Sequence, residues 1–317
     1  MTRISTYTQN HQMIDLMLAR GKDVAEGNRQ LSSGKIAADF KDLGRQATSL
    51  LSAKSIGSRF EASLRASQEI GLRMEVYNSS LSALTEVGDQ LRDEVVKATA
   101  NNSGLAFMNI VRGLYERVAG LLNTEVDNRY IFGGTRTDTA PVVATTEASL
   151  LALATTGDAF VNNSTKLTAQ VDDNRTMEYG VLASDIATNL FDSFRRIMQF
   201  SAGTLPSGAG AFAPAGTFSE PLTDNQRRFL QSEVAGIKQS VDSLRDAEAQ
   251  NGVRMDQLAK INQRQSDDLV FWRGFISNIE DANLTEVIAN LNEDRTALEA
   301  STQVVARLSR VSLLDFI

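Results

Sequence analysis

Hydrophobic residues near both ends of the chain recur at intervals of three, four or seven, which places them on one face of an α-helix. The C-terminal face, over residues 283–317, carries Leu284, Ile288, Leu291, Leu298, Val305 and Leu308. The N-terminal face, over a predicted helix at 4–31, carries Ile4, Tyr7, Ile14, Met17, Val24 and Leu31. No adjacent segment covers either face. We therefore expect the two helices to pair, and these residues to form an assembly interface with other molecules.

Two longer stretches keep an apolar seam over many turns, which indicates coiled-coil packing. The first begins near Gln46, and its predicted core consists of Ile70, Met74, Tyr77, Leu81, Leu84 and Leu91. The second opens at Thr223 and Asp224, and its predicted core consists of Leu230, Val234, Ile237, Val241, Leu244, Met255, Leu258 and Trp272. Polar residues enter this second seam at 248–251 and 262–265, where stability is lost but the register of the helices is fixed.

The segments between these stretches are shorter. Asn101 to Gly104 breaks the first stretch, and a third helix with an apolar face from Met108 to Leu122 is predicted to close at 128–134. Helical periodicity disappears from 135 to about 185, where Val161, Leu167 and Val171 suggest short strands. Residues 186–200 are again amphipathic, and 201–221 form a predicted exposed loop.

The order of these elements predicts a mainly α fold. Its long, coiled-coil-like helices carry paired N- and C-terminal helices and a small β-containing (α+β) inserted outer domain. The predicted domains are paired terminal helices at 1–45 and 281–317, a long helical rod at 46–134 and 224–280, and a variable insert at 135–223. Two helices alone bury little apolar surface, so we expect the ends to become ordered on assembly.

Composition narrows the function classes. The chain has 317 residues, of which 42% are hydrophobic and 22% charged, with a net charge of −7 and no Cys. No run of Lys or Arg could neutralise phosphates, so we expect neither nucleic acid nor membrane as a partner. The N-terminus lacks the pattern of a cleaved signal peptide, and no apolar window is long enough for a membrane span.

Candidate chemistry is sparse. His11 is the only histidine, and a lone ring beside a helix seam is more often packing than a base. The LSSGK sequence at 31–35 lacks the Ser or Thr that a phosphate loop needs after Lys35. Adjacent carboxylates such as Asp267 and Asp268 point about 100° apart on a helix, which favours solvated faces. We predict no catalytic, cofactor-binding or metal-binding residues, and no enzyme activity.

Several short segments at the two ends are distinctive. The start of the chain reads MTRISTYTQNHQMIDLM and then QLSSGK, YIFGGT stands at 130–135, and the end contains NLTEVIANL, ALEAS and LSRVSLLDFI. These segments resemble the bacterial flagellin superfamily, and within it the hook–filament junction branch. The resemblance covers about 1–135 and 224–317 and skips the insert. Residues 36–46 depart from it, because they lack the Pro-Ser-Asp-Asp type turn of many members.

The resemblance implies a fold and a role. Members pair their terminal helices into the inner tube of the flagellum and project the insert outward. It implies a structural, extracellular adaptor that joins hook to filament and leaves the cell by the flagellar type III route without a cleaved signal peptide. The implied partners are further copies in a ring or helical assembly, a neighbouring hook-associated protein, flagellin, and an export chaperone at the C-terminal region.

Two other functions stay open from the sequence. Within the same superfamily, the chain could be a flagellin that forms the filament itself. The heptad seams alone would also suit an intracellular coiled-coil scaffold. Localisation separates the three, since it distinguishes the hook boundary, the whole filament and the cytoplasm.

Overall fold

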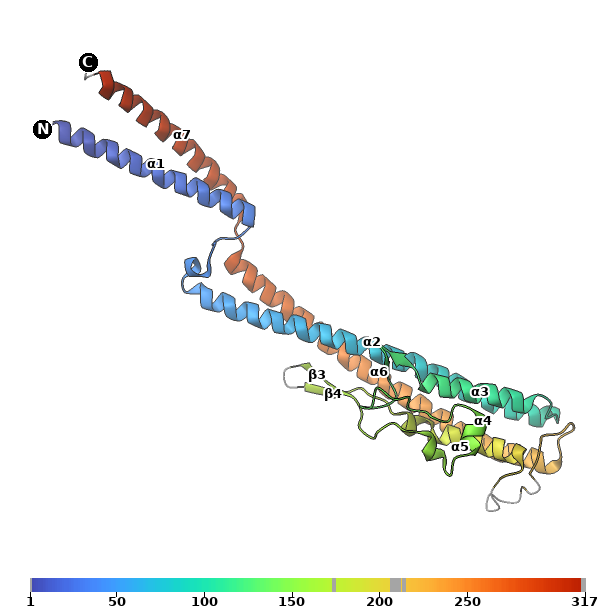
Figure 1. The fold of residues 1–317 in the computed structure, drawn as a ribbon. Coiled ribbons are helices and arrows are strands. Elements are labelled where there is room, and N and C mark those ends of the chain that lie inside the picture. The colour runs from blue at the N-terminus through green and yellow to red at the C-terminus, as the bar shows by residue number, and fades with distance from the viewer. Residues whose placement is uncertain (1, 173–174, 206–211, 213–214, 315–317) are drawn as a thin grey trace. The chain divides into compact units, whose positions relative to one another are not determined.

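The computed structural model describes residues 2–172, 175–205, 212 and 215–314, and it is mainly helical (Figure 1). The helices are α1 (Thr2–Ser33), α2 (Gln46–Asn101), α3 (Phe107–Leu122), α4 (Glu147–Leu151), α5 (Ala183–Ala202), α6 (Asp224–Glu280) and α7 (Leu284–Leu314). Two antiparallel pairs of strands, β1 (Glu125–Val126) with β2 (Arg129–Tyr130) and β3 (Thr168–Asp172) with β4 (Arg175–Glu178), lie in the middle of the chain. Short 3₁₀ turns occupy Phe40–Leu43 and Thr156–Ala159. The predicted fold class is confirmed.

The helix ends follow from local chemistry. α1 ends at Ser33 because Gly34 takes a φ of 69°, a left-handed conformation that other residues adopt at a cost. α6 begins at Asp224, where the side chain of Thr223 accepts a hydrogen bond from the backbone N–H of Gln226 at 3.2 Å. Both boundaries agree with the sequence prediction.

The chain divides into two compact units. One comprises residues 1–61 and 266–317, and it is called the terminal unit below. The other comprises residues 62–265 and is called the central unit. These borders lie inside α2 and α6, whereas the predicted domains divide the chain at 45, 134, 223 and 281. The three-domain division therefore remains a prediction.

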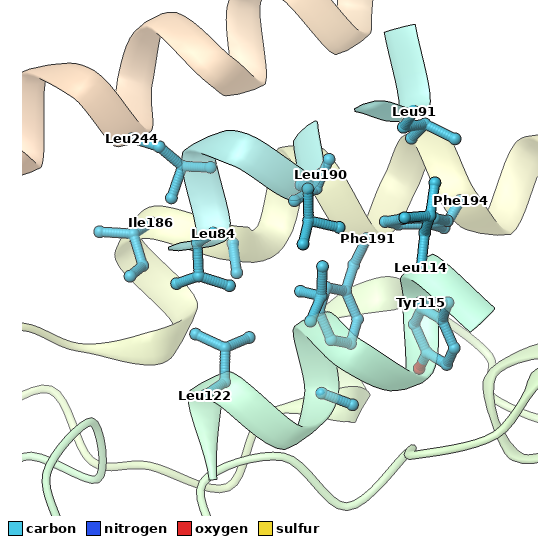
Figure 2. Packing of buried hydrophobic residues seen from close by; sticks show 14 of the residues in the cluster. Leu84, Leu91, Leu114, Tyr115, Leu122, Ile186, Leu190, Phe191, Phe194 and Leu244 are labelled. Atoms are coloured by element: carbon cyan, nitrogen blue, oxygen red, sulfur yellow. The ribbon is translucent and has the colours of Figure 1, made fainter. Parts of the chain in front are cut away.

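The central unit is built around one apolar core, to which α2, α3, α5 and α6 contribute many of the buried residues (Figure 2). Leu84 and Leu91 come from α2, Leu114, Tyr115 and Leu122 from α3, Ile186, Leu190, Phe191 and Phe194 from α5, and Leu244 from α6. Buried residues of the insert, among them Leu150 and Val171, belong to the same cluster. The insert therefore completes the core of the rod helices instead of enclosing a core of its own.

Two details of the middle region differ from the prediction. The third helix ends at Leu122, about six residues early, because 125–130 folds into a tight hairpin. Its turn residues Asp127 and Asn128 both have positive φ, 53° and 58°, as the type I′ turn of a two-residue hairpin requires. The predicted strand at Val161 is wrong, since that residue lies outside the β3–β4 pair, whereas Val171 lies in β3.

Candidate assembly interface

In the terminal unit, α1 and α7 run antiparallel and pack along one another (Figure 1). Val287 and Leu291 are buried on α7, and Leu298 and Val305 continue the same face as half-buried residues. On α1, a Cβ added to Gly27 would lie 3.1 Å from Leu291 Cδ1, so the glycine permits the close approach of the two helices. The pair therefore packs around a seam with heptad spacing.

Two polar contacts fix the register of this pair. Arg20 Nη1 donates to Asp294 Oδ1 at 2.6 Å, and Arg295 Nη2 donates to Asn28 Oδ1 at 2.8 Å. Both contacts join residues more than 260 positions apart in the sequence. The terminal helices thus recognise each other by charge as well as by apolar packing.

The structure separates the predicted interface residues into two groups. Leu291 is buried in the seam, and Met17, Val24, Leu298 and Val305 are half-buried along it. The outer faces carry Ile14, Leu31, Leu284 and Ile288, whose side chains are 39%, 40%, 45% and 45% exposed. The side chains of Ile4, Tyr7 and Leu308 lie outside the part of the chain that the structure describes.

Sequence reasoning missed some members of both groups. Val287 lies in the seam, and its position four residues before Leu291 is the signal that identifies it. Leu16, Leu18 and Val304 are exposed on the outside of the pair. Leu18 lies four residues after Ile14 and Val304 lies four residues before Leu308, so helical spacing could have identified both. Leu16 is not three, four or seven residues from any predicted member, so the spacing gave no signal for it. Pairing α1 with α7 thus leaves apolar side chains uncovered on both helices.

A short tie joins the terminal helices to the ends of α2 and α6. Lys35 and Asp281 form an antiparallel bridge, in which the backbone N–H of Ile36 donates to Glu280 and that of Ala282 donates to Gly34. Lys35 Nζ lies 2.6 Å from Asp281 Oδ1, and this hydrogen bond lowers the pKa of the aspartate and raises that of the lysine. Lys54 Nζ lies 2.7 Å from Glu280 Oε2. The two chain segments that lead to α1 and α7 are therefore held side by side.

Most predicted rod residues lie in the core of the central unit. The buried ones are Ile70, Met74, Tyr77, Leu81, Leu84, Leu91, Leu230, Ile237, Val241, Leu244 and Leu258. Val234 and Met255 are partly buried and pack against that core. Trp272 is only half-buried and lies in the terminal unit, so its position departs from the prediction.

The polar seam positions make specific contacts. Asn251 is fully buried, and its Nδ2 donates to the Met74 carbonyl oxygen at 2.9 Å. Gln265 Nε2 donates to Ser63 Oγ at 3.0 Å and to the Val171 carbonyl oxygen at 2.7 Å. These side chains bond α6 to α2 and to β3, as expected of polar residues that fix a register.

The YIFGGT segment at 130–135 is a structural anchor of the central unit. Tyr77 donates its hydroxyl hydrogen to the Ile131 carbonyl oxygen, and its ring meets Phe132 edge-on at 5.2 Å. A Cβ on Gly133 would lie 2.2 Å from the Arg136 carbonyl oxygen, and Gly134 has a φ of 66°. Only glycine fits this close backbone approach and the left-handed turn without rearrangement. The motif therefore attaches the segment after α3 to α2.

The described residues show little sign of other kinds of site. No group of three or more His, Cys, Asp or Glu side chains there could hold a metal ion. None of the helices, over the same residues, is long and apolar enough to cross a membrane. One pocket of about 440 Å³ lies beside the N-terminus of α3, where Arg112 pairs with Glu147.

Comparison with known proteins points to one class. No family model matches the chain. Flagellar hook-associated protein 3 of Escherichia coli K12 is 23% identical over 301 residues, covering 90% of each chain. Flagellar hook-associated protein 3 of Salmonella typhimurium LT2 is 22% identical over an alignment of 337 residues, covering 99% of each.

Solved structures agree on the fold. A structure described as a flagellar hook-associated protein from Vibrio parahaemolyticus matches with a TM-score of 0.59 and 15% identity, over 76% of this chain and all of that one. The crystal structure of Bacillus cereus FlgL matches with a TM-score of 0.52 and 12% identity, over 72% of this chain and 98% of that one. At these identities the two structures support the fold.

The paired terminal helices and the long helices agree with the sequence matches, and together they make the chain similar to flagellar hook-associated proteins. More particularly, it is a distant homologue of flagellar hook-associated protein 3 over nearly its full length. The resemblance to the junction branch noted from the sequence is thus confirmed. The prediction that the chain is not an enzyme is confirmed by this homology.

Proposed function

We propose that the chain is a structural adaptor that joins the flagellar hook to the filament. The observation that carries the proposal is near full-length similarity to flagellar hook-associated protein 3, in a chain whose terminal helices leave apolar faces uncovered. Burying such faces against neighbouring subunits is favourable, at about 25 cal/mol for each Å² of apolar area removed from water. The uncovered residues Ile14, Leu31, Leu284 and Ile288 are then the contact surface.

The proposed partners follow from that surface. Further copies of the chain, a neighbouring hook-associated protein and flagellin would cover the terminal helices after assembly. An export chaperone would cover α7 before assembly, because an exposed apolar helix invites premature association. The location is the extracellular flagellum, reached by the flagellar type III route.

Removal of residues 284–317 tests the assembly role. The central unit draws its core from residues 62–265 alone, so the truncated chain should keep a folded central unit. We expect the truncated chain to be absent from washed flagella, and we expect cells that carry only this truncated chain to be non-motile. Wild-type motility of cells with this truncation would refute the proposal.

Immunolabelling separates the adaptor from a filament-forming flagellin. The adaptor predicts one labelled spot per flagellum, at the boundary between hook and filament. Label along the whole filament would favour the flagellin alternative, and cytoplasmic label would favour a coiled-coil scaffold.

A further inference from the structure

Asn251 and Gly252 form a pair that occurs once in the sequence, since no other asparagine of the chain is followed by glycine. In an unfolded chain, an asparagine before glycine loses its side-chain ammonia faster than other asparagines. The reason is that a following residue without a Cβ lets its backbone nitrogen reach the side-chain amide. The pair is therefore the position of this chain most open to spontaneous deamidation.

The folded chain holds this pair in a form that does not react. Both residues lie inside α6, and Asn251 is fully buried. In an α-helix, the N–H of residue 252 donates to the carbonyl oxygen of residue 248, so its nitrogen cannot turn toward the preceding side chain. The side-chain amide is also held, because its Nδ2 donates to the Met74 carbonyl oxygen at 2.9 Å. Reaction therefore requires α6 to open.

Once the helix is open, the chemistry needs only water. The backbone nitrogen of Gly252 attacks Cγ of Asn251 and forms a new C–N bond. The bond from Cγ to the side-chain nitrogen breaks, and that nitrogen leaves as ammonia with the proton from the backbone N–H. Water then opens the resulting succinimide ring at either carbonyl carbon. The products are an aspartate, or an isoaspartate whose main chain runs through the former side-chain carbon.

Neither product fits the place that Asn251 occupies. An aspartate carboxylate has no N–H to donate, so it would set an acceptor against the Met74 carbonyl oxygen and bury a charge there. An isoaspartate adds one carbon to the main chain, so the hydrogen bonds of α6 on its two sides lose their register. Deamidation therefore removes the contact that Asn251 makes between α6 and α2.

The presence of Gly252 has no explanation in the packing of the described residues. Glycine destabilises a helix interior relative to alanine. Apart from the chain neighbours and the nearby backbone of α6 itself, no atom of the described residues lies within 4 Å of a Cβ built on Gly252. Its φ is not positive either. An alanine would fit here, and it would slow the closure of the succinimide ring.

We propose that Asn251 is a deamidation site which is open only while the chain is unfolded, and that the reaction there prevents the central unit from folding. Folding protects the site, and each period spent unfolded converts a further share of the chains irreversibly. The modification thus limits the time for which an unfolded chain stays able to fold. This inference concerns the central unit and does not depend on the adaptor role.

Incubation of the full-length chain in mildly alkaline buffer, with and without urea, tests the protection. Peptide mapping by mass spectrometry measures aspartate and isoaspartate at position 251. Conversion should be about tenfold faster or more in urea, because the interior of a packed helix opens rarely. Gly252→Ala should slow conversion in urea, whereas Gly113→Ala, at another glycine with open space around its Cβ position, should not. Equal conversion with and without urea, or in the two variants, would overturn the proposal.

Refolding of the chain after its incubation in urea tests the consequence. Dilution allows refolding, and brief protease digestion then removes the chains that stay unfolded. The share of modified position 251 should be about tenfold lower in the surviving central unit than before digestion, because an unpaired buried carboxylate or an interrupted helix opposes folding. Asn251→Asp, made directly, should melt below the wild type. An unchanged modified share after digestion, or a variant that melts with the wild type, would overturn the proposal.

Discussion

At the scale of single residues, Tyr77 shows how one hydroxyl supports the fold. It is buried, and its hydroxyl donates to the Ile131 carbonyl oxygen in the YIFGGT segment. Tyr77→Phe would leave that carbonyl without its partner, and we expect a loss of about 1–3 kcal/mol in the free energy of unfolding. Urea denaturation would measure the loss. Tyr130→Phe, at a partly exposed ring, is the control and should cost less than about 0.5 kcal/mol.

The same residue gives a pH dependence. Burial raises the pKa of the Tyr77 phenol well above its usual 10.0. A raised pKa in the folded state contributes stability that is complete below pH 10 and is lost as the pH rises toward the folded pKa. In that range the contribution falls by about 1.4 kcal/mol per pH unit. Between pH 10 and 11.5, the wild type should therefore lose stability more steeply than Tyr77→Phe, and equal slopes would contradict the assignment.

Arg196 and Glu233 form an ion pair in which removing either partner should have a different effect on stability. The guanidinium makes hydrogen bonds of 2.8–3.1 Å to both carboxylate oxygens, and Glu233 is only 5% exposed while Arg196 is 39% exposed. Arg196→Met leaves the buried Glu233 carboxylate without its partner and should lower the free energy of unfolding by about 3 kcal/mol or more. Glu233→Gln leaves a cation that remains solvated, so the loss should be smaller. Chemical denaturation of both variants measures the difference. A larger loss for Glu233→Gln would contradict the burial argument.

At the scale of elements, the packing of α1 on α7 depends on small residues at the contact. A side chain at Gly27 must displace Leu291. At Gly21, apart from the chain neighbours and the nearby backbone of α1 itself, no atom of the described residues lies within 4 Å of a Cβ. Gly27→Gln should therefore weaken the pair by about 1–3 kcal/mol, and Gly21→Gln should leave it intact or slightly more stable. Amide hydrogen exchange of α7 would report the difference. Equal exchange in the two variants would show that α1 does not pack on this side of α7.

The elements also show what a sequence can predict. Apolar periodicity located the long helices, and Gly34 and Asp224 marked their ends, because these signals are local. At the start of α7 the predicted seam differs from the observed one. Leu284 and Ile288 were predicted to lie in the seam but are exposed, whereas Val287 is buried in it. Which of several apolar residues turns inward depends on the partner helix, and that partner lies more than 260 residues away. The hydrogen bond from Gln265 to Val171 could not be predicted either. Val171 lies in the insert, whose sequence has no clear hydrophobic period that would place it next to α6.

At the scale of the whole molecule, the candidate interface was predictable only in outline. The sequence showed that both ends carry uncovered apolar faces, which indicated assembly. It did not show that Phe271 and Phe275 are exposed on α6, because Trp272 beside them was predicted to lie in the buried seam. An exposed aromatic residue and a buried one look alike until the packed side of the helix is known.

The two compact units should differ in stability. The central unit contains a large apolar core from Ile70 to Ile261, whereas the terminal unit depends on helix pairs with few fully buried side chains. Local opening costs least where few apolar contacts must be broken. We therefore expect fast amide exchange in α1 and α7 and slow exchange over residues 70–101 and 230–261. Exchange along α6 should become faster beyond Gln265, although the helix continues to Glu280.

Assembly should remove this difference. If the outer faces of α1 and α7 are covered by neighbouring subunits, exchange in the terminal unit should slow by orders of magnitude in isolated flagella. Exchange in the central unit should change little, since its core is already complete in the free chain. The peptide containing Leu105, exposed in the central unit, is an internal control for general effects of the sample. Unchanged exchange in α1 and α7 after assembly would show that these helices are not the contact surface.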